Sequence, residues 1–572
     1  MRYYFKELLI LIYALIGSNA YYDRIADLGF SLSGLFFAVL LLICLLGIVL
    51  TSYVRNLSLR IFYALIIFFS SVLYLAYENI TANTLSYNAF ISLVNASGFV
   101  GEALEQFHSQ ITVAVLQSLL LLIAILLRPN DKSLFLHKLS VAAPVLVVFL
   151  LSIILFIRGG EGNKGLQSPF IPIAYAGLAA YEASNAIIGE RKNVQITREV
   201  KPTNFDIILI IDESISPSYL DINSNYGVLT NLKNENAGID IFNYGYAAAI
   251  TNCSYAANLT IRYGGTRGDY RRIISTMPSI WQYAKKANYH TVYVDAQRTG
   301  MRRQNGMSEE EIKFIDEFIQ FDETSVVSRD LVAASKLVEL INNSTQDFII
   351  VNKMGAHFPV HDKYPDQFEL YKPSLPRGSF ENIAYTGSRE GFSGEFDDWV
   401  LYRNSYRNTL LWSVGGFFKE VFTNSNLDNA VIIYTSDHGQ NLHEDGSEGV
   451  GTHCSSKPKM EEGMVPLVII QGSNLETLNW NQYLKDNKDK SSAYNVFPTL
   501  LSLMEYEPSK IKQTYGNSLN SLTDDDLTFN TLFNARLGRI PTWKKIKPEN
   551  ITVPSESLRS QEASLKSKSS AL

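Results

Sequence analysis

Residues 430–440 read AVIIYTSDHGQ, a run of apolar and β-branched residues that ends in an aspartate beside a histidine. A short apolar run of this kind is typical of a buried strand in a parallel sheet, and ligands gather at the carboxyl ends of such strands. Asp437 and His438 would stand at one exit from the sheet, where a sharp turn lets both side chains point into one site. This stretch therefore indicates both the fold class and the position of a functional site.

Further apolar runs share this character, and helical stretches separate them. Segments such as SIWQYAKKAN (279–288) and SRDLVAASKLVELINN (328–343) have the spacing of amphipathic helices. Strands that alternate with helices predict an α/β domain with a mostly parallel central sheet covered by helices. The other strand-like runs are FDIILIID (205–212), TVYVDA (291–296), DFIIVNKM (347–354) and PLVIIQG (466–472).

The first 158 residues are of a different kind, because uncharged apolar stretches dominate them. A helix needs about 20 apolar residues to cross the core of a bilayer. We predict an α-helical membrane domain of five spans. The first stretch is short, and an uncleaved signal-like anchor is its alternative interpretation. The five stretches are 8–22, 28–54, 61–77, 109–127 and 139–157.

Lysine and arginine are unevenly distributed between the loops that join these spans. With a cytoplasmic N-terminus, seven basic residues lie on the inside and Arg24 alone lies outside. The positive-inside rule then predicts that the chain from residue 159 onward is exported. The net charge of −6 offers no polybasic body, so we expect no nucleic-acid partner. The inside residues are Arg2, Lys6, Arg55, Arg60, Arg128, Lys132 and Lys138.

Four parts follow from these patterns, and two cysteines fall in the third. Cys253 and Cys454 either form a disulfide in an oxidising compartment or remain free thiols, while Cys44 lies in the second span. The pairing stays open at this point. The predicted parts are a transmembrane domain (1–158), a membrane-surface bridging helix and linker (159–203), an exported domain (204–542) and a polar, disordered tail (543–572).

Histidines concentrate in the exported domain, where five of the eight fall between residues 357 and 453. Glu213 follows a predicted strand and, with Asp437 and His438, would supply the ligands of one cation. Mixed nitrogen and oxygen ligands suit zinc better than magnesium or calcium. His357 and His453 would serve a second metal or bind phosphate. Such a site can activate a hydroxyl nucleophile against a phosphate ester. The histidines interpreted as ordinary loop residues are His361 and His443.

Several segments occur in the order seen in the sulfatase and alkaline-phosphatase-like superfamily. With five spans in front, the chain resembles the bacterial inner-membrane phosphoethanolamine transferases of that superfamily. Carried over residue by residue, the resemblance implies metal ligation by Glu213, Asp437 and His438, with His357 and His453 as further site residues. It also implies an alkaline-phosphatase-like fold, a periplasmic catalytic domain and one or two Zn²⁺ ions or another divalent cation. The segments are FDIILIIDES, WQYAKKANYHTVYVDAQ, GAHFPVHDKYP, YRNSYRNTLLWSV, YTSDHGQNL, GTHCSSKP and AYNVFPTLLSLM.

The implied reaction is a phosphotransfer at the outer face of the inner membrane. Phosphoethanolamine would pass from phosphatidylethanolamine to lipid A, lipopolysaccharide core or another envelope glycan through a covalent phospho-enzyme intermediate. A phosphoglycerol transferase of the same fold is one alternative, and a non-catalytic membrane scaffold is another. The expected protein is a multi-pass monomer whose partners are the membrane, the lipid donor and a lipid or glycan acceptor.

The nucleophile is where the chain departs from the family, which uses a threonine at the start of a helix. Backbone N–H groups and the dipole favour an arriving phosphate there. In AAAITNCSYAANLTIRYGG (247–265), Ser254 begins the expected helix and Gly264 stands where it would end. Thr251 keeps the residue type, so both hydroxyls remain candidates, with Ser254 first. Cys253 comes last, because the Pro-Ser-Arg context of sulfatase maturation is missing.

A second departure concerns the loop 78–110, where the family carries Asn, Thr and Glu residues that hold the ethanolamine phospholipid. The segment NASGFVGEAL (95–104) offers Asn95, Ser97 and Glu102 at imperfect spacing. We interpret Asn95 and Glu102 as substrate-binding candidates. An ordinary amphipathic loop helix is the competing interpretation.

Overall fold

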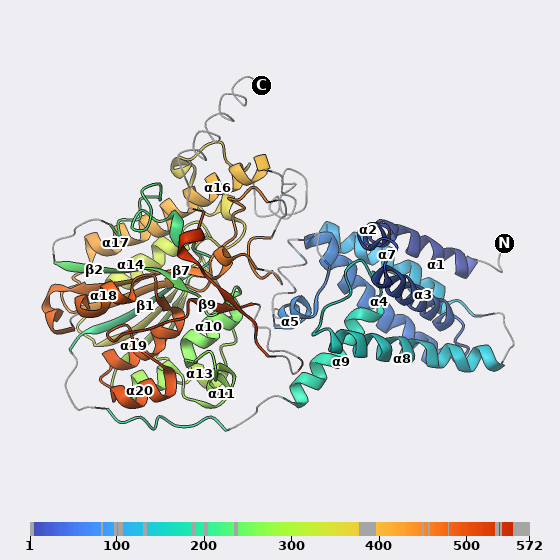
Figure 1. The fold of residues 1–572 in the computed structure, drawn as a ribbon, viewed down its shortest axis with the longest axis horizontal. Coiled ribbons are helices and arrows are strands. Elements are labelled where there is room, and N and C mark those ends of the chain that lie inside the picture. Colours follow the sequence, from blue (N-terminus) through green and yellow to red (C-terminus); the bar gives the residue numbers. More distant parts are fainter. Residues whose placement is uncertain are drawn as a thin grey trace, which may run out of the picture. The chain divides into compact units, whose positions relative to one another are not determined.

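The computed structural model describes most of the chain, and its residues fall into two compact units. One unit is made mainly of residues up to 186 and the other mainly of residues from 187 on. Figure 1 draws the helices of the first unit and the sheet with its helices of the second. The described residues are 5–81, 84–95, 100, 104, 107–129, 134–185, 190–198, 204–233, 238–376, 396–447, 451–455, 458–478, 480–531, 537 and 540–552.

The first unit is built of helices, because apolar residues in a bilayer must satisfy their backbone groups within each segment. Among the described residues, four helices are long and apolar enough to cross a membrane: α3, α4, α7 and α8. α9 packs against α8 and α4 and buries its apolar side chains in the core of this unit. The helices are α1 (Phe5–Ile16), α2 (Ser18–Leu28), α3 (Leu32–Thr51), α4 (Leu57–Thr81), α5 (Tyr87–Asn95), α7 (His108–Leu126), α8 (Leu134–Ile157) and α9 (Phe170–Ser184).

The predicted first span is divided between α1 and α2, with Gly17 between them. The 12 residues of α1 make a helix of about 18 Å, shorter than the ~30 Å hydrocarbon core. Lys6 Nζ, at the start of α1, donates to the carbonyl of Leu127 at the end of α7. Tyr21 of α2 donates to the carbonyl of Gln167, beyond the far end of α8. The two helices together therefore reach both ends of the bundle, and the count of five spans stays a prediction.

The second unit contains an eight-stranded sheet of order β4-β3-β5-β1-β6-β7-β2-β8. All neighbours from β4 to β6 are parallel, whereas β7 is antiparallel to β6 and to β2. Every residue of β1, β5 and β6 is buried, as their continuous apolar sequences require. The mostly parallel sheet is confirmed. The strands are β1 (Asp206–Asp212), β2 (Ile239–Ala248), β3 (His290–Asp295), β4 (Glu317–Gln320), β5 (Asp347–Asn352), β6 (Ala430–Ser436), β7 (Met464–Gly472) and β8 (Ser491–Ser492).

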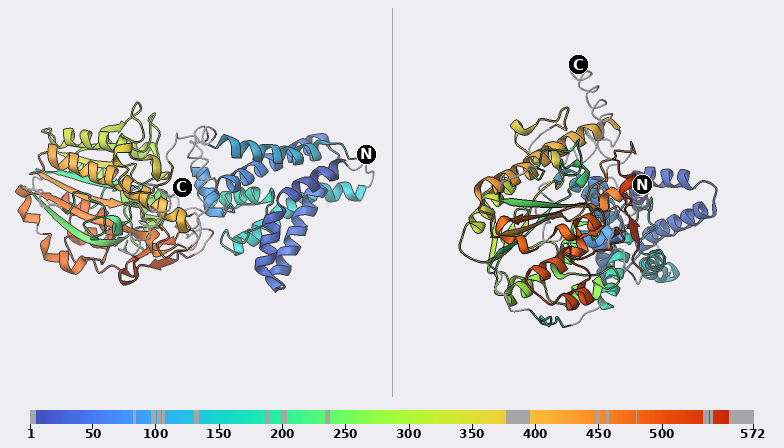
Figure 2. Two further views of the ribbon diagram at one scale, coloured as in Figure 1. Left: turned by 90° about the horizontal axis from the view of Figure 1, so that it is seen from above. Right: turned by 60° about the vertical axis from the view of Figure 1, so that its left-hand side comes forward.

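Helices cover both faces of this sheet (Figures 1 and 2). Ile208 and Ile210 of β1 pack in one core cluster with Leu337 of α14 and Phe417 of α17. On the other face, the Trp281 ring of α12 meets the ring of Phe348 in β5 edge to face, with centroids 5.3 Å apart. The helices are α10 (Ser254–Tyr263), α11 (Tyr270–Thr276), α12 (Ile280–Lys286), α13 (Glu309–Ile312), α14 (Arg329–Ile341), α16 (Phe396–Leu410), α17 (Phe417–Asn424), α18 (Asn481–Asn487), α19 (Val496–Leu503) and α20 (Pro508–Tyr515).

The C-terminal segment is ordered further than its polar composition predicts. β10 (Trp543–Lys545) pairs antiparallel with β9 (Thr528–Asn530). Ile546 is buried, and the Trp543 ring lies edge to face against Tyr270 with centroids 6.2 Å apart. The prediction of a disordered tail is therefore wrong for residues 543–552, because two apolar side chains anchor an otherwise charged segment. Residues 553–572 lie outside the described residues.

Candidate active site

The register of two neighbouring strands brings Glu213 and Asp437 together. Asp212 ends β1 and pairs with Ser436, which ends the parallel strand β6. The next residue on each strand is Glu213 or Asp437, so both carboxylates leave the sheet at the same level. The Asp437 N–H donates to the Asp212 carbonyl at 3.0 Å, and the Ser214 N–H donates to Asp437 Oδ1 at 3.1 Å. These bonds hold the two exits against each other.

Glu213, Asp437 and His438 form a buried cluster of potential metal ligands. One ligand atom from each lies within 4.8 Å of the others. The His438 Nδ1–H donates to the carbonyl of Gly439 at 2.8 Å, which leaves Nε2 facing the carboxylates. Nε2 lies 3.4 Å from Glu213 Oε1 and 3.7 Å from Asp437 Oδ2. Two carboxylates and one imidazole nitrogen are a donor set that fits Zn²⁺.

The pKa values of these three groups show how strongly the cluster favours positive charge. Burial and the charge of Glu213 raise the pKa of Asp437 to about 7. Burial favours neutral His438, but the Asp437 charge and the hydrogen bond to Glu213 outweigh it and raise the pKa of His438 to about 9. Burial alone would raise the pKa of Glu213, but the hydrogen bond to His438 and the positive charge of His438 hold that pKa well below its ordinary value. Two buried carboxylates in contact require a cation beside them.

Ser254 lies against this cluster at the first residue of α10. Its Oγ donates to Glu213 Oε1 at 3.2 Å and lies 3.1 Å from His438 Nε2. The helix starts at this residue, as predicted, and ends before Gly264, whose φ of +75° suits glycine. The first amide N–H groups of a helix have no intrahelical acceptor and can bind an anion. A hydroxyl, a potential metal site and a helix N-terminus thus meet at one point.

Thr251, the second candidate nucleophile, makes no such contacts. Its backbone forms an isolated bridge with Asn530, and its side chain is fully buried. Within the described part of the chain, Thr251 Oγ1 has no hydrogen-bond partner. The structure brings Ser254, and not Thr251, into contact with Glu213 and His438.

The two further histidines differ in their relation to the cluster. The His453 ring stacks on the His438 ring, with centroids 4.5 Å apart and planes at 23°. Partial burial and the positive charge of His438 lower the pKa of His453 to about 3. His357 follows β5, the other neighbour of β1, and its side chain is exposed. Its Nδ1 lies 2.7 Å from the Phe358 carbonyl, which orients the ring.

Two amide side chains that the sequence did not single out also contact the carboxylates. Gln297 Nε2 donates to Glu213 Oε2 at 3.2 Å and to the Lys353 carbonyl at 2.7 Å. Asn258 Nδ2 lies 3.5 Å from Asp437 Oδ2. Two signals could have indicated them, because Gln297 follows a predicted strand and Asn258 lies one helical turn beyond the candidate serine.

A buried lysine, Lys353, pairs with Asp212, the residue that precedes Glu213. It was also not identified from the sequence. Lys353 Nζ lies 2.5 Å from Asp212 Oδ2 and 4.0 Å from Asp330 Oδ2, and all three side chains are buried. Asp330 accepts the N–H groups of Met354 and Gly355 at 2.7 and 2.9 Å. A Cβ at Gly355 would lie 2.2 Å from Asp212 Oδ1, so this turn requires glycine. The network ties the turn after β5 to the end of β1.

The remaining residues considered in the sequence have other surroundings or lie outside the described structure. His361 is buried in the 3₁₀ turn Val360–Asp362. His443 stacks on Trp399 with centroids 4.0 Å apart, which explains its burial as a packing role. The donor-binding candidates whose side chains lie outside the described residues are Asn95, Ser97 and Glu102.

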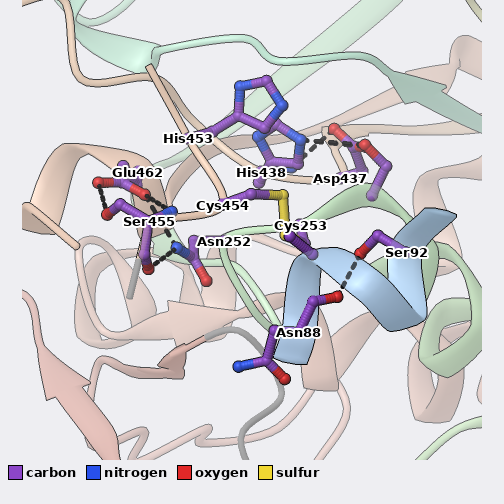
Figure 3. The surroundings of a disulfide bond; sticks show 12 residues. Asn88, Ser92, Asn252, Cys253, Asp437, His438, His453, Cys454, Ser455 and Glu462 are labelled. Atoms are coloured by element: carbon purple, nitrogen blue, oxygen red, sulfur yellow. Dashed lines mark hydrogen bonds and ion pairs between the residues drawn. A yellow bond between two sulfur atoms is a disulfide. The ribbon is translucent and has the colours of Figure 1, made fainter. Parts of the chain in front are cut away.

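Cys253 and Cys454 form a disulfide, which decides the pairing that the sequence left open (Figure 3). Their Cα atoms are 5.0 Å apart, although 201 residues separate them in the chain. Cys44 is a free, buried cysteine in α3. Because Cys253 is bonded, it cannot act as the nucleophile in this state.

The family model described as "Sulfatase" matches residues 206–506, more than half of the chain. The chain belongs to the sulfatase family. Among curated proteins, this sulfatase-family chain is 24% identical over 159 residues to phosphoethanolamine transferase EptA of Salmonella typhimurium. It is 25% identical over 183 residues to EptA of Escherichia coli K12. These matches cover only 27% and 31% of the relatives' length.

One solved structure resembles both units of this sulfatase-family protein. It is the integral membrane lipooligosaccharide phosphoethanolamine transferase A of Neisseria meningitidis, with 15% identity and a TM-score of 0.63. The match covers 88% of this chain and 96% of the other. At this identity the likeness establishes the fold: apolar helices followed by an α/β domain. The four long apolar helices of the described residues are consistent with this membrane-protein fold.

Proposed function

We propose that this protein transfers phosphoethanolamine from phosphatidylethanolamine to lipid A, lipopolysaccharide core or another envelope glycan. Membership of the sulfatase family and the EptA relatives support this class of reaction. The observation that carries it is the position of Ser254, whose Oγ lies within hydrogen-bond distance of both Glu213 and His438. A hydroxyl held against potential metal ligands at a helix start is the arrangement that nucleophilic attack on phosphorus needs.

Glu213, Asp437 and His438 would hold a Zn²⁺ ion in this proposal. The donor set fits such an ion, and the raised pKa of both Asp437 and His438 reflects a buried excess of negative charge that a cation would relieve. Bound zinc supplies a Lewis acid that favours the deprotonated form of a nearby hydroxyl and neutralises phosphoryl charge. Gln297 and Asn258 would orient the two carboxylates through the contacts described above.

The chain's own residues then divide the work of a two-step transfer. Ser254 Oγ forms the bond to phosphorus, and the bond from phosphorus to the diacylglycerol oxygen breaks. The amide N–H groups at the start of α10 bind phosphoryl oxygens. The lowered pKa of His357 leaves its imidazole neutral, so it would take up the proton that Ser254 releases and pass it to the departing oxygen. His453 would help to orient His438 through ring stacking. In the second step an acceptor hydroxyl gives its proton to His357 and bonds to phosphorus, and the bond from phosphorus to Ser254 Oγ breaks. Ser254 Oγ then recovers that proton.

Mass spectrometry of envelope glycolipids tests this proposal in cells. Cells that express the gene should carry glycolipids with a phosphoethanolamine increment, and cells that express the Ser254→Ala variant should lack it. An increment of phosphoglycerol would instead support the alternative transferase. No increment from a zinc-loaded, correctly inserted protein would favour the non-catalytic scaffold.

A further inference from the structure

The Cys253–Cys454 disulfide joins the two loops that carry a site side chain each. Cys253 is the N-cap residue of α10 and directly precedes Ser254. Cys454 directly follows His453. The bond therefore fixes the distance between the backbone that presents the proposed nucleophile and the backbone that presents the stacked imidazole. The sheet itself does not set this distance, because neither residue lies on a strand.

Hydrogen bonds next to the disulfide also hold the two loops together (Figure 3). The Cys454 N–H donates to the Asn252 carbonyl at 2.9 Å. Asn252 Nδ2 donates to the Ser455 carbonyl at 3.1 Å and to Glu462 Oε2 at 2.9 Å. Glu462 also accepts the Ser455 hydroxyl at 2.6 Å. The residues on either side of the sulfur atoms are thus bound to one another, and a shift in one loop would be felt in the other.

These contacts close a ring around the candidate site. From Ser254 the chain leads through Cys253, the disulfide and Cys454 to His453. The His453 ring stacks on His438, whose Nε2 returns to Ser254 Oγ at 3.1 Å. Apart from peptide bonds, the disulfide is the covalent link in this ring. Opening it leaves hydrogen bonds and ring stacking to keep Ser254 and His453 in place.

Cys454 is an exposed residue and Cys253 is half-buried, so a small dithiol would approach the bond from the Cys454 side. Cys454 has a φ of +55°, in the left-handed region that residues other than glycine adopt only when their surroundings hold them there. Residues 451–455 contain no helix or strand that would keep this conformation. Once the bond is cut, the loop is expected to relax toward negative φ and to carry His453 with it.

We propose that the Cys253–Cys454 disulfide is a positioning element of the proposed active site and that a dithiol switches the site off reversibly by reducing it. The inference rests on the proposed function. A thiolate of the dithiol attacks Cys454 Sγ, the S–S bond breaks, and Cys253 leaves as a thiolate that takes up a proton. The second thiol of the reagent then displaces Cys454. The products are two cysteine thiols and one oxidised, cyclic dithiol, so two electrons and two protons pass to the protein.

The test uses the full-length zinc-loaded protein in detergent micelles that contain phosphatidylethanolamine, in a Cys44→Ala background. This background leaves Cys253 and Cys454 as the remaining cysteines. The protein is treated with dithiothreitol, freed of reagent by gel filtration and reloaded with zinc. Alkylation followed by intact-mass analysis counts the thiols. The same preparation gives the rate at which a phosphoethanolamine adduct forms on the Ser254 peptide, and hydrogen–deuterium exchange across the α/β unit.

Reduction should lower the adduct rate at least about tenfold without changing the lipid concentration that gives half the maximal rate, because the bond aligns the reacting groups and does not bind lipid. Exchange should rise in residues 251–256 and 451–455 and stay unchanged in β1 and β6. Reoxidation should restore both properties. The Cys253→Ala/Cys454→Ala variant should be equally slow with and without dithiothreitol, which separates reduction from removal of zinc by the reagent.

The outcomes separate this inference from the proposed function. An unchanged adduct rate in fully reduced protein would overturn the positioning role while leaving the transferase intact. If oxidised protein forms no adduct but exchange rises in both segments on reduction, the proposed function fails and the disulfide's positioning role stands. If reduction changes exchange at neither segment, the inference is overturned, whether or not the oxidised protein forms the adduct.

Discussion

Ser254 Oγ lies 3.1 Å from His438 Nε2 and 3.2 Å from Glu213 Oε1, although 184 and 41 residues separate it from them in the chain. The parallel strands β1 and β6 supply the carboxylates and the imidazole, and the first residue of α10 supplies the hydroxyl. The site is therefore assembled from the ends of three elements, and each can be tested separately.

Substituting each of the two candidate hydroxyl residues in turn shows which one is the nucleophile. Ser254→Ala should lower the transfer rate at least about 1,000-fold, since it removes the atom that bonds to phosphorus. Thr251→Val should leave the rate within about threefold and raise the melting temperature by about 2 °C, because Thr251 Oγ1 is buried without a hydrogen-bond partner among the described residues. A severe loss of transfer in the valine variant would reverse the assignment.

Asp437→Asn should abolish transfer and lower the affinity for zinc by at least about tenfold, because a charged ligand is replaced by a neutral amide. Asp269→Asn is the matched control, since Asp269 is exposed and pairs with Arg272 on the surface. It should keep both properties. Zinc content by elemental analysis and glycolipid mass spectrometry provide the readouts. An Asp437→Asn protein with full zinc affinity and full activity would refute this placement of the metal.

Zinc affinity should rise with pH. His438 has a pKa raised to about 9 and must lose its proton to bind the metal, so protons and zinc compete below that pH. Near pH 8 the dissociation constant should fall about tenfold for each pH unit, the slope of one released proton, and near pH 7 it should fall more steeply because Asp437, whose pKa is raised to about 7, then releases a proton as well. Competition titrations, corrected for the protonation of the chelator, measure this slope. A flat profile would mean that His438 is neutral before zinc binds or does not bind it.

Reporter fusions test the five-span topology at its weakest point, the first span. A phosphatase fused after Gly29 should be active, because α1 and α2 together reach from one end of the bundle to the other. A fusion near Asp131 should be inactive and one near Lys201 active. An inactive fusion after Gly29 would show that the first segment does not cross. With an active fusion near Lys201, it would then require an odd number of crossings between Gly29 and Lys201, which the four long apolar helices of the described residues do not give.

The apolar runs allowed the parallel core to be predicted, because strands buried on both faces carry little else. β1 and β6 end where the carboxylates begin, so Glu213 and Asp437 could be placed at strand ends and in one cation site, whereas the pairing of β1 with β6 came only from the structure. The antiparallel direction of β7 could not be predicted. An apolar run does not indicate whether a strand is parallel or antiparallel to its neighbours. The other neighbour of β7 is β2, whose mixed sequence IDIFNYGYAA adds no clear signal.

The features that could not be predicted depend on contacts between residues far apart in the sequence. The choice between Ser254 and Thr251 depends on three-dimensional distances to Glu213 and His438, and the pairing of Cys253 with Cys454 spans 201 residues. Gln297 is one polar residue among many until its amide is seen 3.2 Å from Glu213 Oε2. The order of the segment after Trp543 was not predicted, because its lysines make it polar overall although Ile546 is buried.

Peptide mass analysis after incubation with phosphatidylethanolamine tests the central claim most directly. Purified, zinc-loaded protein should gain one phosphoethanolamine group, and fragmentation should place it on Ser254. The increment should disappear when an acceptor glycolipid is added, because the group is then transferred. An increment on Thr251 would contradict the assignment of the nucleophile. The absence of any covalent increment, with zinc bound and transfer proceeding, would contradict the phospho-enzyme account as a whole.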